Sequence, residues 1–295
     1  MKAFILAETV DGACALAAGA RGLADEVLLL TIGKDVPTGV ADRSFSLAIP
    51  EENIVEDCYP AVFELIDVEK PDLIMVEPTR CLKGLAGRIA ARLGTAMITD
   101  VTMLDTEVAG NRYYGGVGER GYKVIGAIRV VSVDPAVFAE MPSSGSDDVT
   151  DIAFKAPTRY TEKLSTEALP VSGTNILKAE RVICVGRGFA DREDLELAFE
   201  FARKLDGEVG CTRPLTEGVD WMPKNSYIGV SGLSLNPRVY IGVGVSGQMQ
   251  HMVGCSGATA IIAINKDKGA PIFKQADIGI VADLKEILPV LNAAW

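Results

Sequence analysis

The stretch Val239–Asp267 constrains the fold of this chain more than any other part of its sequence. It opens with an almost unbroken run of apolar and glycine residues, Val239–Val245, which predicts a buried strand. Ser246-Gly247 then predicts a turn, a helix is predicted from Gln248, and Ala260–Ile264 predicts a second apolar strand. A strand that enters a helix through a glycine turn presents free backbone N–H groups and the positive end of a helix dipole, which suits a pyrophosphate.

The first half of the chain alternates between short apolar runs and helical spacing, and this βαβ rhythm predicts a mostly parallel sheet with helices on both faces. Predicted strands cover Lys2–Ala7, Glu26–Ile32, Phe45–Ile49 and Asp72–Val76, and predicted helices cover Gly12–Ala24, Val55–Glu69 and Leu82–Leu93. Three glycine-bounded β-rich segments follow, at Val101–Leu104, Arg112–Val117 and Tyr122–Val133. They predict hairpins at the edge of the sheet.

The rhythm restarts at Arg181 and predicts a second α/β domain. Its further predicted strands cover Arg181–Val185, Glu208–Cys211, Tyr227–Val230 and Ile278–Val281, and its predicted helices cover Asp194–Leu205, with Asp191 as N-cap, and Leu284–Leu291, with Asp283 as cap. Residues 142–179 between the two domains are rich in serine, threonine and glycine with weak apolar periodicity. We expect residues 1–141 and 180–295 to form two domains, with 142–179 as either an interdomain hinge or an extended arm.

Bulk composition excludes several classes of function. A net charge of −11 and few aromatic residues argue against nucleic-acid binding. Six cysteines without a C-x-x-C pair predict free thiols in a reducing compartment, and a single histidine argues against a histidine metal cluster. The N-terminal run is too short for a signal peptide, and no apolar run is long enough to span a membrane. The expectation is a cytoplasmic protein without bound metal or stable membrane insertion.

The strand ends of the second domain carry glycine, hydroxyl, amide or guanidinium groups. They are Gly186-Arg187-Gly188, Thr212-Arg213, Ser231 with its flanking glycines, Ser246 to His251, and the pair of Asn265 and Asp283. Each alone is also typical of a plain turn, a cap or a satisfied core histidine. Together they predict one large phosphate-bearing ligand, because ligands of open α/β sheets bind at the carboxyl ends of the strands. The sequence shows no catalytic constellation such as a Ser-His-Asp spacing or a Walker lysine loop.

The ordered pattern VYIGVGVSGQMQH…G…IAINKD over Val239–Asp267 closely resembles the electron transfer flavoprotein alpha subunit family. So do the tail APIF…AD…GIVADL over Ala270–Leu284 and, more loosely, GLAGRIAARLG at Gly84–Gly94. The resemblance implies FAD in the C-terminal, Rossmann-like domain. The residues that it places around FAD are Arg187, Thr212, Arg213, Ser231, Ser246, Gly247, Gln248, Met249, Gln250, His251, Asn265, Asp283 and Leu284.

By the same resemblance, Arg213 would lie by the isoalloxazine ring, Ser231 near flavin N5 and His251 at the C2 carbonyl. Asn265, Asp283 and Leu284 would lie on the adenosine side. In the family, threonine is frequent at the position of Ser231 and serine at the position of Thr212. Both substitutions keep the hydroxyl group. A histidine, a helix N-terminus and an arginine would stabilise the negative charge of reduced flavin.

The sequence therefore predicts the alpha subunit of a heterodimeric electron transfer flavoprotein, an electron carrier without a substrate acid or base. The resemblance implies a homologous beta subunit and a flavin dehydrogenase of the acyl-CoA type as partners, with electrons from NADH through the beta subunit left open. Two other functions stay open on the residues alone. One is a stand-alone oxidoreductase that binds NAD at the Gly186 turn, which lacks the third glycine of the dinucleotide fingerprint, and the other is a nucleotide-binding regulatory module.

Overall fold

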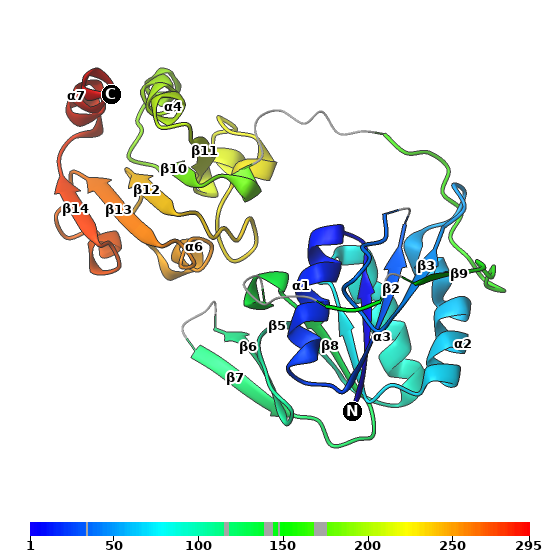
Figure 1. The fold of residues 1–295 in the computed structure, drawn as a ribbon. Helices are drawn as coiled ribbons and strands as arrows, with labels where there is room; N and C mark the ends of the chain where they lie inside the picture. Colours follow the sequence, from blue (N-terminus) through cyan, green and yellow to red (C-terminus); the bar gives the residue numbers. More distant parts are fainter. Residues whose placement is uncertain (34, 115–117, 139–143, 147, 168–175) are drawn as a thin grey trace. The chain divides into compact units, whose positions relative to one another are not determined.

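The structure is a computed structural model that describes residues 1–33, 35–114, 118–138, 144–146, 148–167 and 176–295. The chain divides into two compact units, one of Met1–Tyr113 with Glu119–Glu167 and one of Ala168–Trp295 with Tyr114–Gly118. Each unit is a mostly parallel sheet flanked by helices, which confirms the predicted α/β fold class (Figure 1). No helix within the described ranges is both long enough and apolar enough to cross a bilayer.

The N-terminal unit is built on one sheet with three main helices. Its strands are β1 (Lys2–Ala7), β2 (Glu26–Ile32), β3 (Arg43–Leu47), β4 (Leu73–Val76), β5 (Met97–Leu104), β6 (Val108–Tyr113), β7 (Gly118–Lys123), β8 (Arg129–Val133) and β9 (Val149–Ile152), and its helices are α1 (Val10–Arg21), α2 (Tyr59–Glu69) and α3 (Arg80–Leu93). The strand order is β7-β6-β5-β8-β4-β1-β2-β3-β9, and only the β5–β6 pair among those with a described register is antiparallel.

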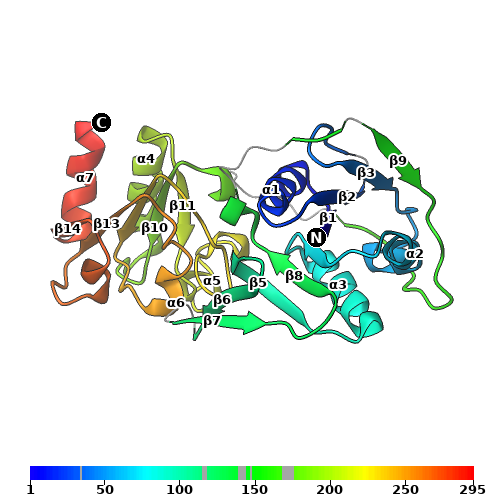
Figure 2. The same cartoon turned by 60° about the horizontal axis from the view of Figure 1, so that its bottom comes forward.

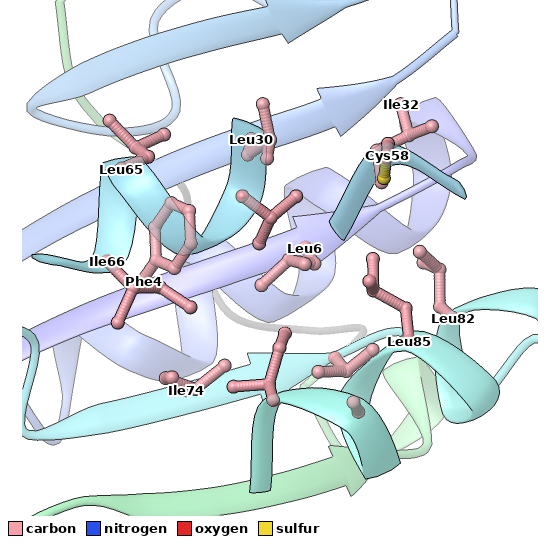
Figure 3. Packing of buried hydrophobic residues seen from close by; sticks show 14 of the residues in the cluster. Phe4, Leu6, Leu30, Ile32, Cys58, Leu65, Ile66, Ile74, Leu82 and Leu85 are labelled. Carbon is pink, nitrogen blue, oxygen red and sulfur yellow. The ribbon is translucent and has the colours of Figure 1, made fainter. Parts of the chain in front are cut away.

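The central strands are buried because helices cover both faces of the sheet. Helices α2 and α3 pack on one face, and α1 packs on the other. Figure 3 shows the first of these interfaces, where strand residues Phe4, Leu6, Leu30 and Ile74 contact Leu65 and Ile66 of α2 and Leu82 and Leu85 of α3. Each such side chain stabilises the fold by roughly 1.5–3 kcal/mol relative to an exposed one.

Local capping fixes the ends of these helices. The Thr9 hydroxyl accepts a hydrogen bond from the Gly12 N–H (3.0 Å) at the start of α1, and the Thr79 hydroxyl accepts from the Leu82 N–H (3.2 Å) at the start of α3. Gly94 adopts φ +64° and ends α3, as its position in the sequence predicts.

The turn between β1 and α1 holds a carboxylate from the neighbouring strand. Glu77, which follows β4, is 6% exposed and accepts hydrogen bonds from the N–H of Glu8 (2.7 Å), the N–H of Thr9 (3.0 Å) and the hydroxyl of Thr9 (2.6 Å). A Cβ on Gly12 would lie 2.4 Å from the Glu77 carboxyl carbon. The turn's donors are therefore satisfied from within the chain.

The C-terminal unit is a five-stranded parallel sheet in the order β11-β10-β12-β13-β14. Its strands are β10 (Arg181–Val185), β11 (Glu208–Cys211), β12 (Val239–Val243), β13 (Ala260–Asn265) and β14 (Ile278–Val281), and its helices are α4 (Leu195–Lys204), α5 (Pro214–Glu217), α6 (Met249–Met252) and α7 (Leu284–Ala294). Helices α4 and α7 cover one face and α6 lies on the other (Figure 2). The order of the strands reverses at β10, because β11 lies on one side of it while β12, β13 and β14 follow on the other. Ligands of doubly wound sheets bind at this switch point, between β10 and β12.

Several predicted elements of the C-terminal unit differ in the structure. Tyr227–Val230 is not a strand but two isolated bridges, because Gly229 adopts φ +148° and turns the chain. The helix predicted from Gln248 is the single turn α6. Asp191 does not cap the next helix with its side chain. Its carboxylate lies 3.2 Å from the Nζ of Lys285 instead.

Two predictions for the N-terminal sheet also need correction. Strand β8 does not belong to an edge hairpin, because it is buried throughout and pairs in parallel with β4 and β5. Strand β9 lies inside the expected connector 142–179 and pairs in parallel with β3 at the edge of the sheet. The Lys163 N–H then donates to the Glu52 carbonyl (3.2 Å), so the segment after β9 also contacts the N-terminal unit. Residues 115–117 of a predicted strand, and 142, 143, 147 and 168–175 of the connector, lie outside the described residues.

Candidate functional site

A cavity of about 670 Å³ lies at the carboxyl ends of β10, β11 and β12, at the switch point of the C-terminal sheet. This volume is in the range of small-molecule and cofactor sites. Its lining residues are Arg187, Gly188, Thr212, Arg213, Pro214, Glu217, Gly218, Tyr227, Ile228, Gly229, Val230, Ser231, Gly244, Val245, Ser246, Gln248, Gln250, His251 and Asn265.

The turn after β10 is packed against the turn after β12. The Gly186 N–H donates to the Val243 carbonyl (3.0 Å), and the Gly188 N–H donates to the Gly244 carbonyl (2.9 Å). A Cβ on Gly186 would lie 2.3 Å from the Gly244 oxygen, so glycine is required here for backbone packing. Because these donors are used, the Gly186 turn does not offer the phosphate cradle of a dinucleotide fingerprint.

The turn after β12, in contrast, leaves its backbone N–H groups unpaired. Within the described part of the chain, no acceptor forms a hydrogen bond with the backbone N–H groups of residues 246–250. Gly247, at φ +80°, is buried in this run, and α6 begins at Met249. Consecutive unpaired N–H groups at a helix start form an anion site. The free N–H groups that the sequence predicts for this turn are therefore present, whereas those of Gly186 and Gly188 in the turn after β10 are paired.

Two arginines add positive charge at the cavity. Arg187 is exposed, and it forms no ion pair with any residue that the structure describes. Arg213 follows β11 and its Nε lies 2.5 Å from the Glu217 carboxylate, a contact that raises the pKa of the guanidinium further. Glu217 therefore orients Arg213 along the cavity wall but also offsets part of its charge.

Hydroxyl groups lie on the same wall. The Tyr227 hydroxyl donates to the Ser231 hydroxyl over 2.7 Å, and both side chains line the cavity. Thr212 is half-buried, and its N–H donates to the Val185 carbonyl (3.0 Å), which holds the end of β11 against β10. The Tyr227 contact leaves the Ser231 oxygen able to donate its own proton to a ligand.

His251 lines the cavity from α6 but is buried. Its Nδ1 lies 2.9 Å from the Ile228 carbonyl oxygen, and its Nε2 lies 2.7 Å from the Tyr240 hydroxyl. Burial lowers the pKa of His251, and the hydrogen bond to the Ile228 carbonyl offsets this only in part. His251 is therefore neutral at pH 7, and both ring nitrogens have partners inside the protein.

A second, smaller cavity of about 40 Å³ shares Gly188, Gly244 and Asn265 with the first. Asp283 and Leu284 line it from the start of α7, where the Asp283 carboxylate accepts from the Lys285 N–H (2.9 Å) and caps the helix as predicted. The Asn265 side chain donates to the Val245 carbonyl (2.9 Å), and its oxygen accepts from the Asp267 N–H (2.9 Å). Asn265 thus shapes the turn after β12 as well as lining both cavities.

The structure brings most of the predicted site residues to one edge of the sheet. Around the larger cavity are Arg187, Thr212, Arg213, Ser231, Ser246, Gln248, Gln250, His251 and Asn265, and around the smaller one are Asn265, Asp283 and Leu284. Gly247 and Met249 line neither cavity. Gly247 packs on Ile272, and the Met249 side chain is 41% exposed.

Sequence reasoning missed Glu217, Tyr227 and Ile228. Glu217 stands four residues after Arg213 on α5, a spacing at which opposite charges meet on a helix. Tyr227 and Ile228 fall in the predicted strand Tyr227–Val230, which gives no indication that they line a cavity. No group of three His, Cys, Asp or Glu side chains in the described ranges could hold a metal ion.

Comparison with known proteins adds independent information. A family model described as the electron transfer flavoprotein domain matches residues 13–157, and one described as the electron transfer flavoprotein FAD-binding domain matches residues 175–256. A solved structure from Mycobacterium smegmatis, described as a thiamin diphosphate-dependent enzyme, matches with 13% identity and a TM-score of 0.25 over 98% of this chain and 59% of that chain. So low a score carries no argument about fold or function.

Curated relatives match over most of their length. The Escherichia coli (strain K12) protein YdiR, named as an electron transfer flavoprotein subunit, is 36% identical over 242 residues, which is 80% of this chain and 78% of that protein. Protein FixB of Salmonella typhimurium is 36% identical over 252 residues, which is 83% of this chain and 80% of that protein. On these matches, the chain belongs to the electron transfer flavoprotein alpha subunit family.

Proposed function

We propose that the C-terminal unit binds FAD in the cavity after β10, β11 and β12, and that the chain carries electrons as the alpha subunit of a heterodimer. The observation that carries this proposal is the run of unpaired N–H groups at residues 246–250, beside two arginines and a cavity of about 670 Å³. These groups suit the pyrophosphate of FAD, so the residues present fit the cofactor. When bound, FAD supplies the one- and two-electron chemistry.

The chain's own residues would bind and orient the flavin. Arg213 supplies positive charge where the isoalloxazine ring is expected, and Ser231 presents a hydroxyl that can donate toward flavin N5. Asn265, Asp283 and Leu284 form the adenosine side. Each charge of the reduced ring is stabilised more strongly beside protein groups of low local dielectric than in water.

The two alternative functions receive less support. A stand-alone oxidoreductase with NAD at the Gly186 turn needs free N–H groups there, and those of Gly186 and Gly188 are bonded to β12 and the turn after it. A nucleotide-binding regulatory module would need no groups that tune a redox potential. Arg213 and the hydroxyl pair of Tyr227 and Ser231 therefore favour the redox function.

The partners are part of the proposal. The family implies a homologous beta subunit, and we infer a flavin dehydrogenase of the acyl-CoA type as electron donor in the cytoplasm, with NADH acting through the beta subunit as the other source. The two donors are distinguished by anaerobic reduction. An acyl-CoA dehydrogenase with its substrate bleaches the flavin in the first case, and NADH alone bleaches it in the second.

Ligand identity is tested by titrating the purified chain with FAD, FMN and NAD. FAD should bind with quenching of flavin fluorescence, FMN should bind more weakly because it lacks the adenosine half, and NAD should not compete. Tight NAD binding with no FAD binding would support the oxidoreductase instead.

A further inference from the structure

Tyr240 is a tyrosine in the middle of a buried strand, behind the candidate FAD cavity. It is 0% exposed, and its neighbours in the core are aliphatic residues and the thiols of Cys184 and Cys255. A buried tyrosine hydroxyl needs a hydrogen-bond partner, and that of Tyr240 lies 2.7 Å from Nε2 of His251. The phenol therefore connects the sheet to α6.

The geometry fixes where the proton of His251 lies. The Ile228 carbonyl can only accept, so Nδ1 of His251, at 2.9 Å, carries the proton and donates it. In the neutral ring Nε2 is then an acceptor, and the Tyr240 hydroxyl donates to it. The resulting chain of hydrogen bonds runs from Tyr240 through His251 to Ile228.

The surroundings keep this imidazole uncharged. Among the described residues, Tyr240 from β12 and Cys184 from β10, whose sulfur lies 3.7 Å from Nε2, contact the imidazole, and Cys255 after α6 interacts in turn with the Tyr240 hydroxyl. Burial raises the pKa of the Cys255 thiol to about 12 and that of Cys184 well above its usual value, so both stay protonated. No carboxylate that the structure describes pairs with His251 to favour the imidazolium.

The same chain of hydrogen bonds holds the loop that carries Ser231. His251 binds the Ile228 carbonyl, and the Val230 N–H donates to the Gln250 carbonyl over 2.7 Å. A Cβ on Gly229 would lie 2.9 Å from that same carbonyl oxygen, so the loop lies directly on α6. Ser231 reaches the cavity wall from this loop.

We propose that Tyr240 is a positioning residue of the flavin site, which holds His251 as the neutral Nδ1–H tautomer so that His251 in turn fixes the 228–231 loop against α6. The flavin part of this inference rests on the proposed function, whereas the tautomer does not. A neutral His251 brings no positive charge to the reduced flavin, so the positive charge expected beside the ring is that of Arg213.

The first test needs no variant and no flavin. His251 is the only histidine of the chain, so ¹⁵N-histidine labelling gives one pair of imidazole nitrogen signals. The signals expected at pH 7 are those of a protonated Nδ1 and an unprotonated, hydrogen-bonded Nε2. A protonated Nε2, or an imidazolium at pH 7, would overturn the proposal.

The second test uses Tyr240→Phe, with Tyr160→Phe as the matched control, because Tyr160 is 62% exposed in the N-terminal unit. Tyr240→Phe should move the Nε2 signal downfield, toward that of a nitrogen without a donor, and raise the Kd for FAD by roughly 10-fold. The control should change neither. An Nε2 signal that stays in place, or one that moves while the affinity for FAD is unchanged, contradicts the positioning role.

The two tests separate the two claims. If the wild-type chain binds no FAD, the proposed function fails, and the imidazole signals still decide whether Tyr240 fixes the tautomer. If Tyr240→Phe does not fold, the wild-type spectrum alone decides whether His251 is the neutral Nδ1–H tautomer with a hydrogen-bonded Nε2.

Discussion

The N–H of Ile272 donates a hydrogen bond to the carbonyl of Ser246 over 3.1 Å, and this bond holds Gly247 directly against the backbone of Ile272. A Cβ on Gly247 would lie 2.3 Å from the Ile272 nitrogen, and Gly247 adopts φ +80°. The turn after β12 is thereby fixed with its own N–H groups turned away from internal acceptors, which is the condition for an anion site.

Gly247→Ala should therefore damage the site from a position that lines neither cavity. We expect a loss of about 1–3 kcal/mol in the free energy of unfolding from backbone strain and a Kd for FAD raised by at least about 10-fold. Gly87→Ala is the matched control, because a Cβ at Gly87 in α3 meets nothing within 4 Å. It should stabilise the chain by roughly 0.5–1 kcal/mol and leave FAD binding unchanged. Normal FAD affinity in Gly247→Ala would contradict this account of the turn.

Arg213→Ala should lower the midpoint potential of the bound flavin on the order of tens of millivolts, because it removes a positive charge that stabilises the reduced ring. Spectroelectrochemistry measures the shift. Arg203→Ala is the control, since Arg203 pairs with Glu196 on the exposed side of α4. A potential that is unchanged, or higher, in Arg213→Ala would place the ring away from this arginine.

His251 predicts a specific dependence of stability on pH. Its folded-state pKa lies below the unfolded value of about 6.5, so below that pH the unfolded state binds more protons and the free energy of unfolding falls as pH falls. His251→Gln lacks this dependence and also leaves the Tyr240 hydroxyl poorly paired. It should be less stable than the wild type at pH 8 by about 1–3 kcal/mol, with a gap that narrows from pH 7 to pH 5.

Urea unfolding followed by tryptophan fluorescence measures this gap, because both tryptophans, Trp221 and Trp295, lie in the C-terminal unit. A gap that widens on acidification would mean that His251 is charged in the folded protein.

Glu77 gives a test of the N-terminal unit by itself. Glu77→Ala leaves the N–H groups of Glu8 and Thr9 without their acceptor in the turn between β1 and α1, and the expected loss is about 2–3 kcal/mol in the free energy of unfolding. Glu64→Ala removes an exposed partner of Lys155 and should change stability by less than about 1 kcal/mol. Circular dichroism during urea unfolding compares the two. Equal effects would show that the buried carboxylate does not hold the turn.

The sequence predicted the fold where apolar periodicity and punctuation agree. Lys2–Ala7, Glu26–Ile32 and Arg181–Val185 are strands with the predicted bounds, since their runs are apolar and end in turn residues. It failed at β8 and β9, whose places in the sheet depend on pairing with strands distant in sequence. Single-sequence patterns do not contain that pairing.

The candidate site was predictable because strand ends of a parallel sheet meet at one edge. The free N–H groups of the Ser246 turn are also predicted from its residues, whereas the pairing of the N–H groups in the Gly186 turn is not, since the two turns look alike as residues and differ only in what each N–H contacts. The partners of His251 were equally hidden, because Ile228 contributes its backbone carbonyl and Tyr240 lies eleven residues away on a strand.

The most direct test of the central claim is the visible spectrum of the chain purified with a co-expressed beta subunit of its family. We expect a yellow complex with flavin absorption that yields FAD on denaturation, and a much lower FAD content in the Gly247→Ala complex. A colourless wild-type complex that takes up no FAD, while the chain folds and pairs normally, would contradict it.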